Sequence, residues 1–188
     1  MVKIDSAEAL IRAVRTGAGI KYLHFWGHRP RPDGRLSASC LSQWWPSRFV
    51  VDGVEYATAE HWMMAGKARL FGDAEAERRI VAAGHPAAAK KEGRLVRNFD
   101  EATWQRERLG IVTEGSVHKF AADAGLRDYL LGTGDRVLVE ASPVDRVWGI
   151  GLTATDEAAT DPSRWRGLNL LGFALMEARE RLRTAETR

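Results

Sequence analysis

The spacing of apolar residues along the chain predicts a fold built mainly from helices. Apolar positions that recur three and four residues apart fall on one helix face, and capping side chains precede most of these segments. The predicted helices are Ala7–Arg15, Ala59–Phe71, a segment from Asp73 to about Ala83, Ala87–Val96, a long segment that starts at Asp100 or Thr103 and includes Phe120, a segment near Ala124–Leu131, and a C-terminal segment whose apolar stripe is Leu168, Leu171, Leu175, Ala178 and Leu182. Such a stripe predicts a helix packed against the core.

Shorter stretches rich in β-branched and aromatic residues predict a few strands. Ile20–Trp26 and Arg136–Glu140 have this composition. Residues 48–56 contain Asp52-Gly53 at their centre, a dipeptide that favours a two-residue hairpin turn. The pattern as a whole predicts an α+β, mostly α-helical fold with a few short strands, including a hairpin near residues 48–56.

Length and composition predict a single compact domain. The chain has 188 residues, of which 45% are hydrophobic and 28% are charged, as in an ordinary globular protein. The sequence contains no repeat, low-complexity tract or linker. We expect residues 1–19 to form an N-terminal helical extension and residues 20–184 to form the domain.

Charge and cysteine content narrow the possible functions. The 28 Lys and Arg residues against 25 Asp and Glu give a pI near 9.2, an excess too small to establish a nucleic-acid partner. The basic loop from Gly27 to Gly34 keeps a nucleic-acid-binding domain among the alternatives. A lone cysteine, Cys40, excludes an internal disulfide, and the first residues contain no signal-peptide or transmembrane run. We expect a cytoplasmic protein without a membrane partner, and no obligate protein partner is evident.

Glu60 and Lys67 are the first candidates for chemistry. They lie seven residues apart on one predicted helix, so both side chains project to the same face. The carboxylate suits an acid, a base or a ligand of sugar hydroxyls, and the ammonium suits a phosphate. The alternative is that Glu60 merely favours the positive end of the helix dipole and that Lys67 is solvated.

Other polar groups are candidates for ligand binding. Asp145, Trp148 and Asn169 lie in and just after a long predicted loop, Ala141–Gly167, and loops of this length are often functional. Basic residues gather near one short helix, where they form either an anion site or a solvated face: Lys90, Lys91, Arg94 and Arg97. The five histidines lack the context of metal ligands, so we expect no metal and no cofactor.

Several motifs occur in an order that resembles the NADAR family, also called YbiA-like. They are Leu41-Ser42-Gln43-Trp44, the run Asp52–Lys67 with Thr58-Ala59-Glu60-His61 inside it, the segment Ala88–Arg94, Trp104 followed by Lys119-Phe120, the run Asp145–Gly151, and the segment Gly167–Arg179. Together they extend from about Tyr22 to Leu182, which is nearly the whole chain.

The resemblance implies a small, mostly helical α+β N-glycosidase. Family activities include cleaving ribosylamino-pyrimidine phosphates of riboflavin synthesis and removing ADP-ribose from guanine in nucleic acid. The substrate would therefore be a ribosyl phosphate or ADP-ribosyl conjugate, possibly attached to nucleic acid. By this resemblance, Glu60 is the leading catalytic carboxylate, Lys67 and Arg94 hold phosphate or position the substrate, Trp44, Trp104 and Trp148 shape the pocket and stack on the ligand, and Asp145 and Asn169 bind ribose or support the residues that do. Glu60, Lys67 and Asp145 form the expected catalytic set.

Two departures from the family pattern bear on the substrate. Many relatives have Trp-Gly-Asp-Gly where this chain has Trp148-Gly149-Ile150-Gly151, and Met63-Met64 replaces a common aromatic residue and Gln. Loss of a pocket carboxylate at position 150 would favour ADP-ribosylated guanine over the riboflavin intermediates. A non-catalytic module that binds NAD or ADP-ribose derivatives is the alternative from another class of protein.

Overall fold

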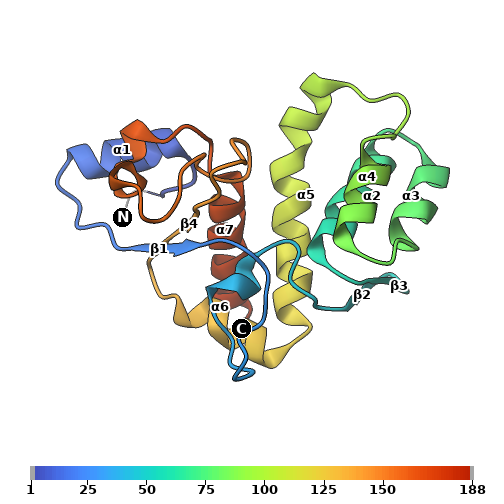
Figure 1. Ribbon diagram of the computed structural model, residues 1–188, viewed down its shortest axis with the longest axis horizontal. Coiled ribbons are helices and arrows are strands. Elements are labelled where there is room, and N and C mark those ends of the chain that lie inside the picture. The colour runs from blue at the N-terminus through green and yellow to red at the C-terminus, as the bar shows by residue number, and fades with distance from the viewer. Residues whose placement is uncertain (1–2, 187–188) are drawn as a thin grey trace. The chain divides into compact units, whose positions relative to one another are not determined.

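The computed structural model describes residues 3–186 and divides into two compact units (Figure 1). Unit 1 is built from the residues up to Ser42 and from Asp128 onward, and unit 2 is Gln43–Arg127. Helix α6 (Ala124–Gly132) spans the point where unit 2 ends and the second part of unit 1 begins. The expected mostly helical α+β class is confirmed, and the expected division at residues 19 and 20 stays a prediction.

Unit 1 contains a short parallel sheet and a long helix. Its elements are α1 (Ala7–Arg15), β1 (Tyr22–Phe25), the 3-10 helix η1 (Ala38–Leu41), β4 (Val137–Glu140), the 3-10 helices η2 (Glu157–Thr160) and η3 (Pro162–Arg164), and α7 (Leu170–Glu186). Strands β1 and β4 pair in parallel, with Tyr22 opposite Val137 and Phe25 opposite Glu140. Helix α7 packs against β4. The sequence indicates both strands but not their pairing, since their partners lie more than a hundred residues apart.

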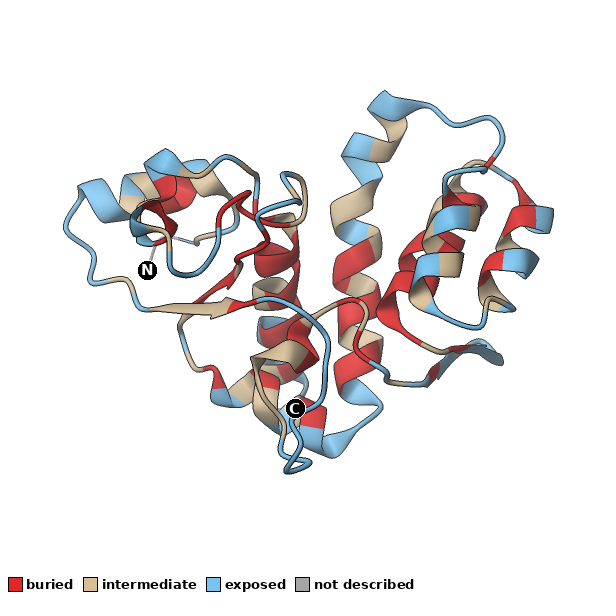
Figure 2. Ribbon diagram, in the orientation of Figure 1, coloured by how far each residue is buried: buried red, intermediate tan, exposed pale blue. Residues whose placement is uncertain are grey.

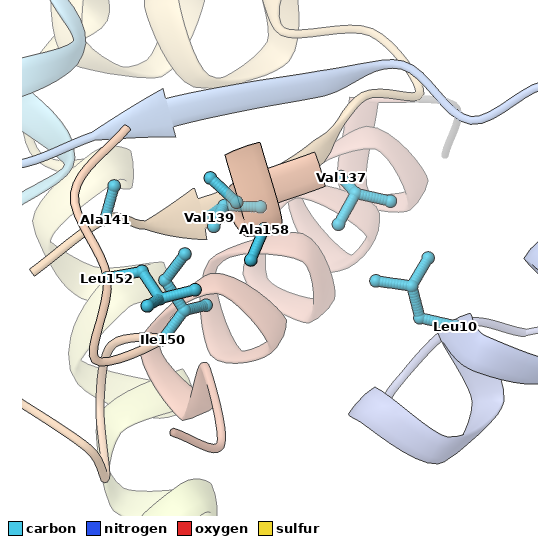
Figure 3. Close-up of a cluster of buried hydrophobic side chains, with 8 residues drawn as sticks. Leu10, Val137, Val139, Ala141, Ile150, Leu152 and Ala158 are labelled. Carbon is cyan, nitrogen blue, oxygen red and sulfur yellow. The ribbon is translucent and has the colours of Figure 1, made fainter. Parts of the chain in front are cut away.

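The core of unit 1 forms where β4 meets the residues that follow it (Figure 3). The buried cluster consists of Leu10, Val137, Val139, Ala141, Ile150, Leu152, Ala158 and Ala159. Ile150 is fully buried there. Position 150 is therefore a core position in this chain, and the expectation that Ile150 replaces a pocket carboxylate loses its structural basis.

Unit 2 is a helical cluster with a hairpin. It contains β2 (Phe49–Val51), β3 (Val54–Tyr56), α2 (Ala59–Leu70), α3 (Ala74–Val81), α4 (Pro86–Gly93) and α5 (Glu101–Ala121). The turn between the strands uses Asp52 and Gly53 with φ of 51° and 78°, as the predicted hairpin requires. Helix α2 packs against α3, α4 and α5, and Figure 2 shows it buried along most of its length.

Close contacts explain the small residues and the methionines around α2. A Cβ atom at Gly66 would lie 2.6 Å from Cγ2 of Ile111, and one at Gly93 would collide with Met64. Met63 and Met64 are both buried. The Met-Met pair therefore packs the interior of unit 2.

Several predicted boundaries differ from the observed ones. The first strand is shorter than expected, and the fourth helix ends at Gly93 rather than at Val96. Helix α7 begins at Leu170, which leaves Leu168 outside the helix and 45% exposed. The rest of the predicted stripe is buried: Leu171, Leu175, Ala178 and Leu182. Short 3-10 helices, which leave no apolar period, interrupt the predicted long loop.

Candidate active site

The start of α2 places a carboxylate in a buried position. Thr58 caps the helix by accepting a hydrogen bond from the amide of His61, and the amide of Glu60 donates to the carbonyl of Gln43 at 3.0 Å. Glu60 is 2% exposed. A carboxylate in the first turn is favoured by the helix dipole, while burial strengthens its electrostatic effect on any charge that develops nearby. Both features suit Glu60 to stabilise a cation in a closed site.

His61, next to Glu60, has a structural role. Its Nε2 atom lies 3.0 Å from the carbonyl oxygen of Ala83 and its Nδ1 atom lies 2.8 Å from the Thr58 hydroxyl. A carbonyl only accepts, so Nε2 carries the proton and Nδ1 accepts from Thr58. Burial lowers the pKa of His61. The neutral, fully buried ring of His61 thus secures the start of α2.

Lys67 is held by aromatic rings and a carbonyl. Its Nζ atom donates to the carbonyl of Gly93 at 2.9 Å and lies 4.1 Å from the ring centre of Phe99 and 5.7 Å from that of Trp104. Burial lowers the pKa of Lys67, and the charge of Glu101 opposes that shift. The ammonium is therefore a positioned cation and not a solvated surface charge.

Glu60 and Lys67 share a face of α2 without forming a pair with each other. Seven residues make nearly two turns, so their α-carbons are separated by a rise of about 10 Å along the axis. The ammonium of Lys67 is engaged by Gly93 and the aromatic rings. This face of α2 therefore carries a carboxylate and a separate cation, an arrangement that suits a ligand with a cationic reacting centre and a distant anionic group.

The other predicted site residues of unit 2 differ in how far they are buried and in what they contact. Trp104 lies beside Lys67, as described. Trp44 is partly buried, and Lys90 Nζ lies 5.9 Å from its ring centre. Arg94 is exposed at the end of α4, and its guanidinium makes no hydrogen bond or ion pair among residues 3–186.

In unit 1, Asp145 and Asn169 organise the backbone around Trp148. The Asp145 carboxylate accepts from the amides of Val147 (2.8 Å) and Trp148 (2.7 Å). Asn169 is fully buried with a φ of 54°. Its side chain accepts from the Glu140 amide at 3.0 Å and donates to the Leu138 carbonyl at 2.9 Å.

These contacts hold the backbone in place, and support of ligand-binding residues by Asp145 and Asn169 stays a prediction. Asp145 shapes the turn that presents Trp148, and Asn169 ties the start of α7 to β4. Direct binding of ribose by either side chain, catalysis by Asp145 and stacking by Trp148 stay predictions.

Three residues contact the predicted site residues although the sequence does not predict these contacts. They are Phe99 and Gly93, which contact Lys67, and Lys90, which lies near Trp44. Phe99 lies in the connection between α4 and α5, directly after Asn98, whose φ is 56°. A lone aromatic residue in a connection has no periodicity, so its contact with Lys67 leaves no signal in the sequence. The proximity of Lys90 to Trp44 depends on tertiary packing in the same way.

Residues 3–186 contain neither of two further features. No group of three or more His, Cys, Asp or Glu side chains is arranged to hold a metal ion in this part of the chain. Within the same residues, no helix has the length and apolarity needed to span a bilayer.

Comparisons with known proteins define the class of this protein. The fold is similar to the NMR structure of Escherichia coli YbiA, with a TM-score of 0.68 and 25% identity over 89% of this chain and 88% of that one. An N-glycosidase of Acanthamoeba polyphaga mimivirus is 41% identical over 165 residues, which cover 85% of this chain and 95% of the relative. An N-glycosidase of Nostoc punctiforme is 34% identical, covering 77% of this chain and 85% of the relative. The expected enzyme class, a hydrolase acting on N-glycosyl compounds, is thereby confirmed.

The family follows from the same comparisons. Residues 24–183 match the NADAR domain, and the chain belongs to the NADAR family.

Proposed function

We propose that this protein hydrolyses the N-glycosidic bond between a nucleobase-like amine and a ribose that carries phosphate or ADP. The observation that carries the proposal is the pair on α2: Glu60 is 2% exposed in the first turn, and Lys67 is held by aromatic rings further along the same face. The relatives named N-glycosidases support the reaction class.

Glu60 has the properties that cleavage of a ribose–nitrogen bond requires. As the bond between the ribose C1′ and the base nitrogen breaks, the bonding electrons leave with the base and positive charge develops on the sugar. A buried carboxylate stabilises that charge and orients a water molecule toward C1′. The water oxygen becomes the C1′ hydroxyl and a water proton goes to the leaving nitrogen, so the reaction consumes one water and no other reactant.

Lys67 has the properties of a phosphate ligand. An ammonium held beside aromatic rings, with burial lowering its pKa, gains from a phosphate because the anion restores the interactions lost from water. Trp104, next to Lys67, offers a flat face for the base or sugar. The exposed Arg94 supplies a second cation from α4 in this proposal.

ADP-ribosylated guanine, free or in nucleic acid, is the first substrate candidate. A ribosylamino-pyrimidine phosphate is the second substrate candidate, and the burial of Ile150 is the reason that it is retained. With Ile150 in the apolar core of unit 1, its difference from the Asp of many relatives gives no reason to exclude riboflavin intermediates.

A chromatographic assay tests the proposal with both substrates. Wild-type protein and the Glu60→Gln variant are incubated with an ADP-ribosyl-guanine oligonucleotide and with a ribosylamino-pyrimidine phosphate, and released base and sugar are measured over time. We expect wild type to cleave one of them and Glu60→Gln to lose at least about a hundredfold in kcat. Wild-type turnover by Glu60→Gln would remove Glu60 from the mechanism.

A matched variant and a binding measurement complete the test. Glu107→Gln makes the same chemical change at an exposed position of α5 and should retain wild-type turnover. Thermal unfolding with each substrate reports binding separately from cleavage. No cleavage of either substrate, with thermal stabilisation retained, would replace the hydrolase proposal with the binding-module alternative.

A further inference from the structure

Unit 1 contains a cavity that is lined by none of the residues predicted for the active site. Its volume is about 710 Å³, and its lining includes Arg12, Ala13, Ile20, Lys21, Asp135 and Arg136. This volume is within the usual range for small-molecule sites of about 300–1,000 Å³. The cavity is therefore large enough for an organic ligand.

The cavity lies where the parallel strands begin. Tyr22 and Val137 form the first pair of the sheet, and the Val137 amide donates to the carbonyl of Lys21 at 2.8 Å. The loop that contains Asp145 and Trp148 instead follows the carboxyl end of β4. Since the four residues of β4 span about 3.3 Å each, the cavity and that loop lie at opposite ends of the sheet.

One wall of the cavity lies outside the family-matched region. The NADAR match covers residues 24–183, whereas α1 contributes Arg12 and Ala13, and the segment after it contributes Ile20 and Lys21. The cavity therefore depends on a part of this chain that the family domain does not include.

The charged groups around the cavity leave an excess of positive charge. Arg12 and Lys21 are exposed, and among residues 3–186 neither side chain makes a hydrogen bond or an ion pair. Arg136 is held in place by the carbonyls of Thr133 (2.8 Å) and Gly132 (2.9 Å).

The acidic group at the cavity does not offset that charge. Asp135 already pairs with Arg183 at 3.1 Å. Two exposed cations, Arg12 and Lys21, and the held cation of Arg136 therefore line the same cavity, which favours an anion.

The remaining walls are apolar. Ile4, Ala13, Ile20 and Val137 line the cavity between the charged side chains, and Ile4 and Ile20 also pack against the buried cluster of unit 1. Apolar walls with a few convergent polar groups are typical of sites for small organic ligands. The lining thus combines an apolar surface with cations for an acidic group.

We propose that this cavity binds a small organic anion whose apolar body packs against Ala13 and Ile20 while Arg12 and Lys21 engage its acidic group. The proposal does not depend on the hydrolase activity, because its test measures binding alone.

A pair of fluorescent dyes tests the proposal. Anilinonaphthalene sulfonate has an apolar aromatic ring system and an anionic sulfonate, and N-phenylnaphthylamine has the same ring system without the sulfonate. We expect the anionic dye to bind with saturation at one site and at least fivefold more tightly than the neutral dye. Equal affinity of the two dyes, or a titration that does not saturate, would overturn the proposal.

Matched variants locate the dye. Arg12→Ala should raise the Kd of the anionic dye at least fivefold, whereas Arg15→Ala, the same change on the same helix outside the lining, should alter it less than twofold. Ala13→Trp should abolish binding of the anionic dye by filling the cavity, with Val14→Trp as its exposed control.

The arginine variants test the proposal even if Ala13→Trp does not fold. Arg12 and Arg15 are both exposed, so their replacement by Ala should leave the fold intact. Circular dichroism confirms that each variant retains its helices. Equal dye affinity in Arg12→Ala and Arg15→Ala would show that the dye binds elsewhere and would overturn the proposal.

Discussion

The ammonium nitrogen of Lys67 lies 4.1 Å from the centre of the Phe99 ring. Phe99 belongs to the connection between α4 and α5, and its edge contact with Phe71, at 5.3 Å between ring centres, fixes its orientation. Two residues earlier, Arg97 is joined to the buried carboxylate of Asp73. The cation of the candidate site is therefore positioned by a connection that the start of α3 holds in place.

We expect Phe99→Leu to lower kcat/KM for a phosphate-bearing substrate by about 3- to 10-fold, the range that follows from loss of one cation–π contact. In the variant the Phe99 ring no longer restricts the ammonium of Lys67, so substrate binding must itself fix the position of the ammonium. Steady-state kinetics on the substrate identified by the chromatographic assay measure the effect. Leu95→Ala, a change at a 58% exposed position in the same connection, should retain wild-type kinetics, and equal kinetics in both variants would contradict a positioning role for Phe99.

Lys67→Met should separate the role of the charge from the role of packing. Methionine keeps the unbranched stem while removing the ammonium. Burial lowers the pKa of Lys67, so the folded state disfavours the charged form, and its removal should change the free energy of unfolding by less than about 1 kcal/mol. Loss of a charge-assisted phosphate contact should reduce kcat/KM about 10- to 100-fold.

Chemical denaturation and kinetics on the same Lys67→Met preparation provide the comparison. Retained stability with reduced turnover fits a functional lysine. Reduced stability with unchanged turnover would show that Lys67 serves only to hold α4 through the Gly93 carbonyl.

The parts of this fold that local chemistry determines were predictable from sequence. Thr58 and Asp100 cap α2 and α5, and such caps can be predicted because a capping oxygen acts within three residues of its position. Asp52-Gly53 likewise specifies its own turn. The spacing of Glu60 and Lys67 predicted a shared helix face for the same reason.

The parts that depend on distant residues were not predictable. Ile150 is buried by residues of β4 and by residues far from it in sequence, such as Leu10. The motif around position 150 therefore does not show that this position lies in the core. Asn169 donates to Leu138, 31 residues away, and a side-chain amide gives no sign of such a partner. Phe99 contacts Lys67 from a connection without apolar periodicity.

The Asp73 carboxylate should make stability sensitive to acid. It accepts from the guanidinium and the amide of Arg97 and from the amide of Ala76. These hydrogen bonds, led by the guanidinium, hold the pKa of Asp73 well below its usual range. A depressed folded-state pKa stabilises the protein above the unfolded pKa of about 3.9, and that stability is lost as the pH falls further toward the folded-state pKa.

We therefore expect wild type to exceed Asp73→Asn in free energy of unfolding at neutral pH, with the difference shrinking as the pH falls from about 5 to about 2. Urea denaturation across this pH range measures it. Asp128→Asn, at an exposed position, controls for the general loss of one carboxylate. A difference between wild type and Asp73→Asn that stays constant down to the lowest pH would contradict the assignment.

Ile150→Asp tests whether position 150 belongs to the core or to a pocket. The side chain is fully buried among Val139, Leu152 and other apolar residues, so an aspartate there would be buried without a partner and should lower the free energy of unfolding by at least about 3 kcal/mol. Ile150→Val removes one methylene and should cost about 0.5–1.5 kcal/mol. Chemical denaturation of both variants measures these values. If Ile150→Asp were as stable as Ile150→Val, the position would face solvent or a pocket, and the missing carboxylate would again favour ADP-ribosylated guanine over the riboflavin intermediates.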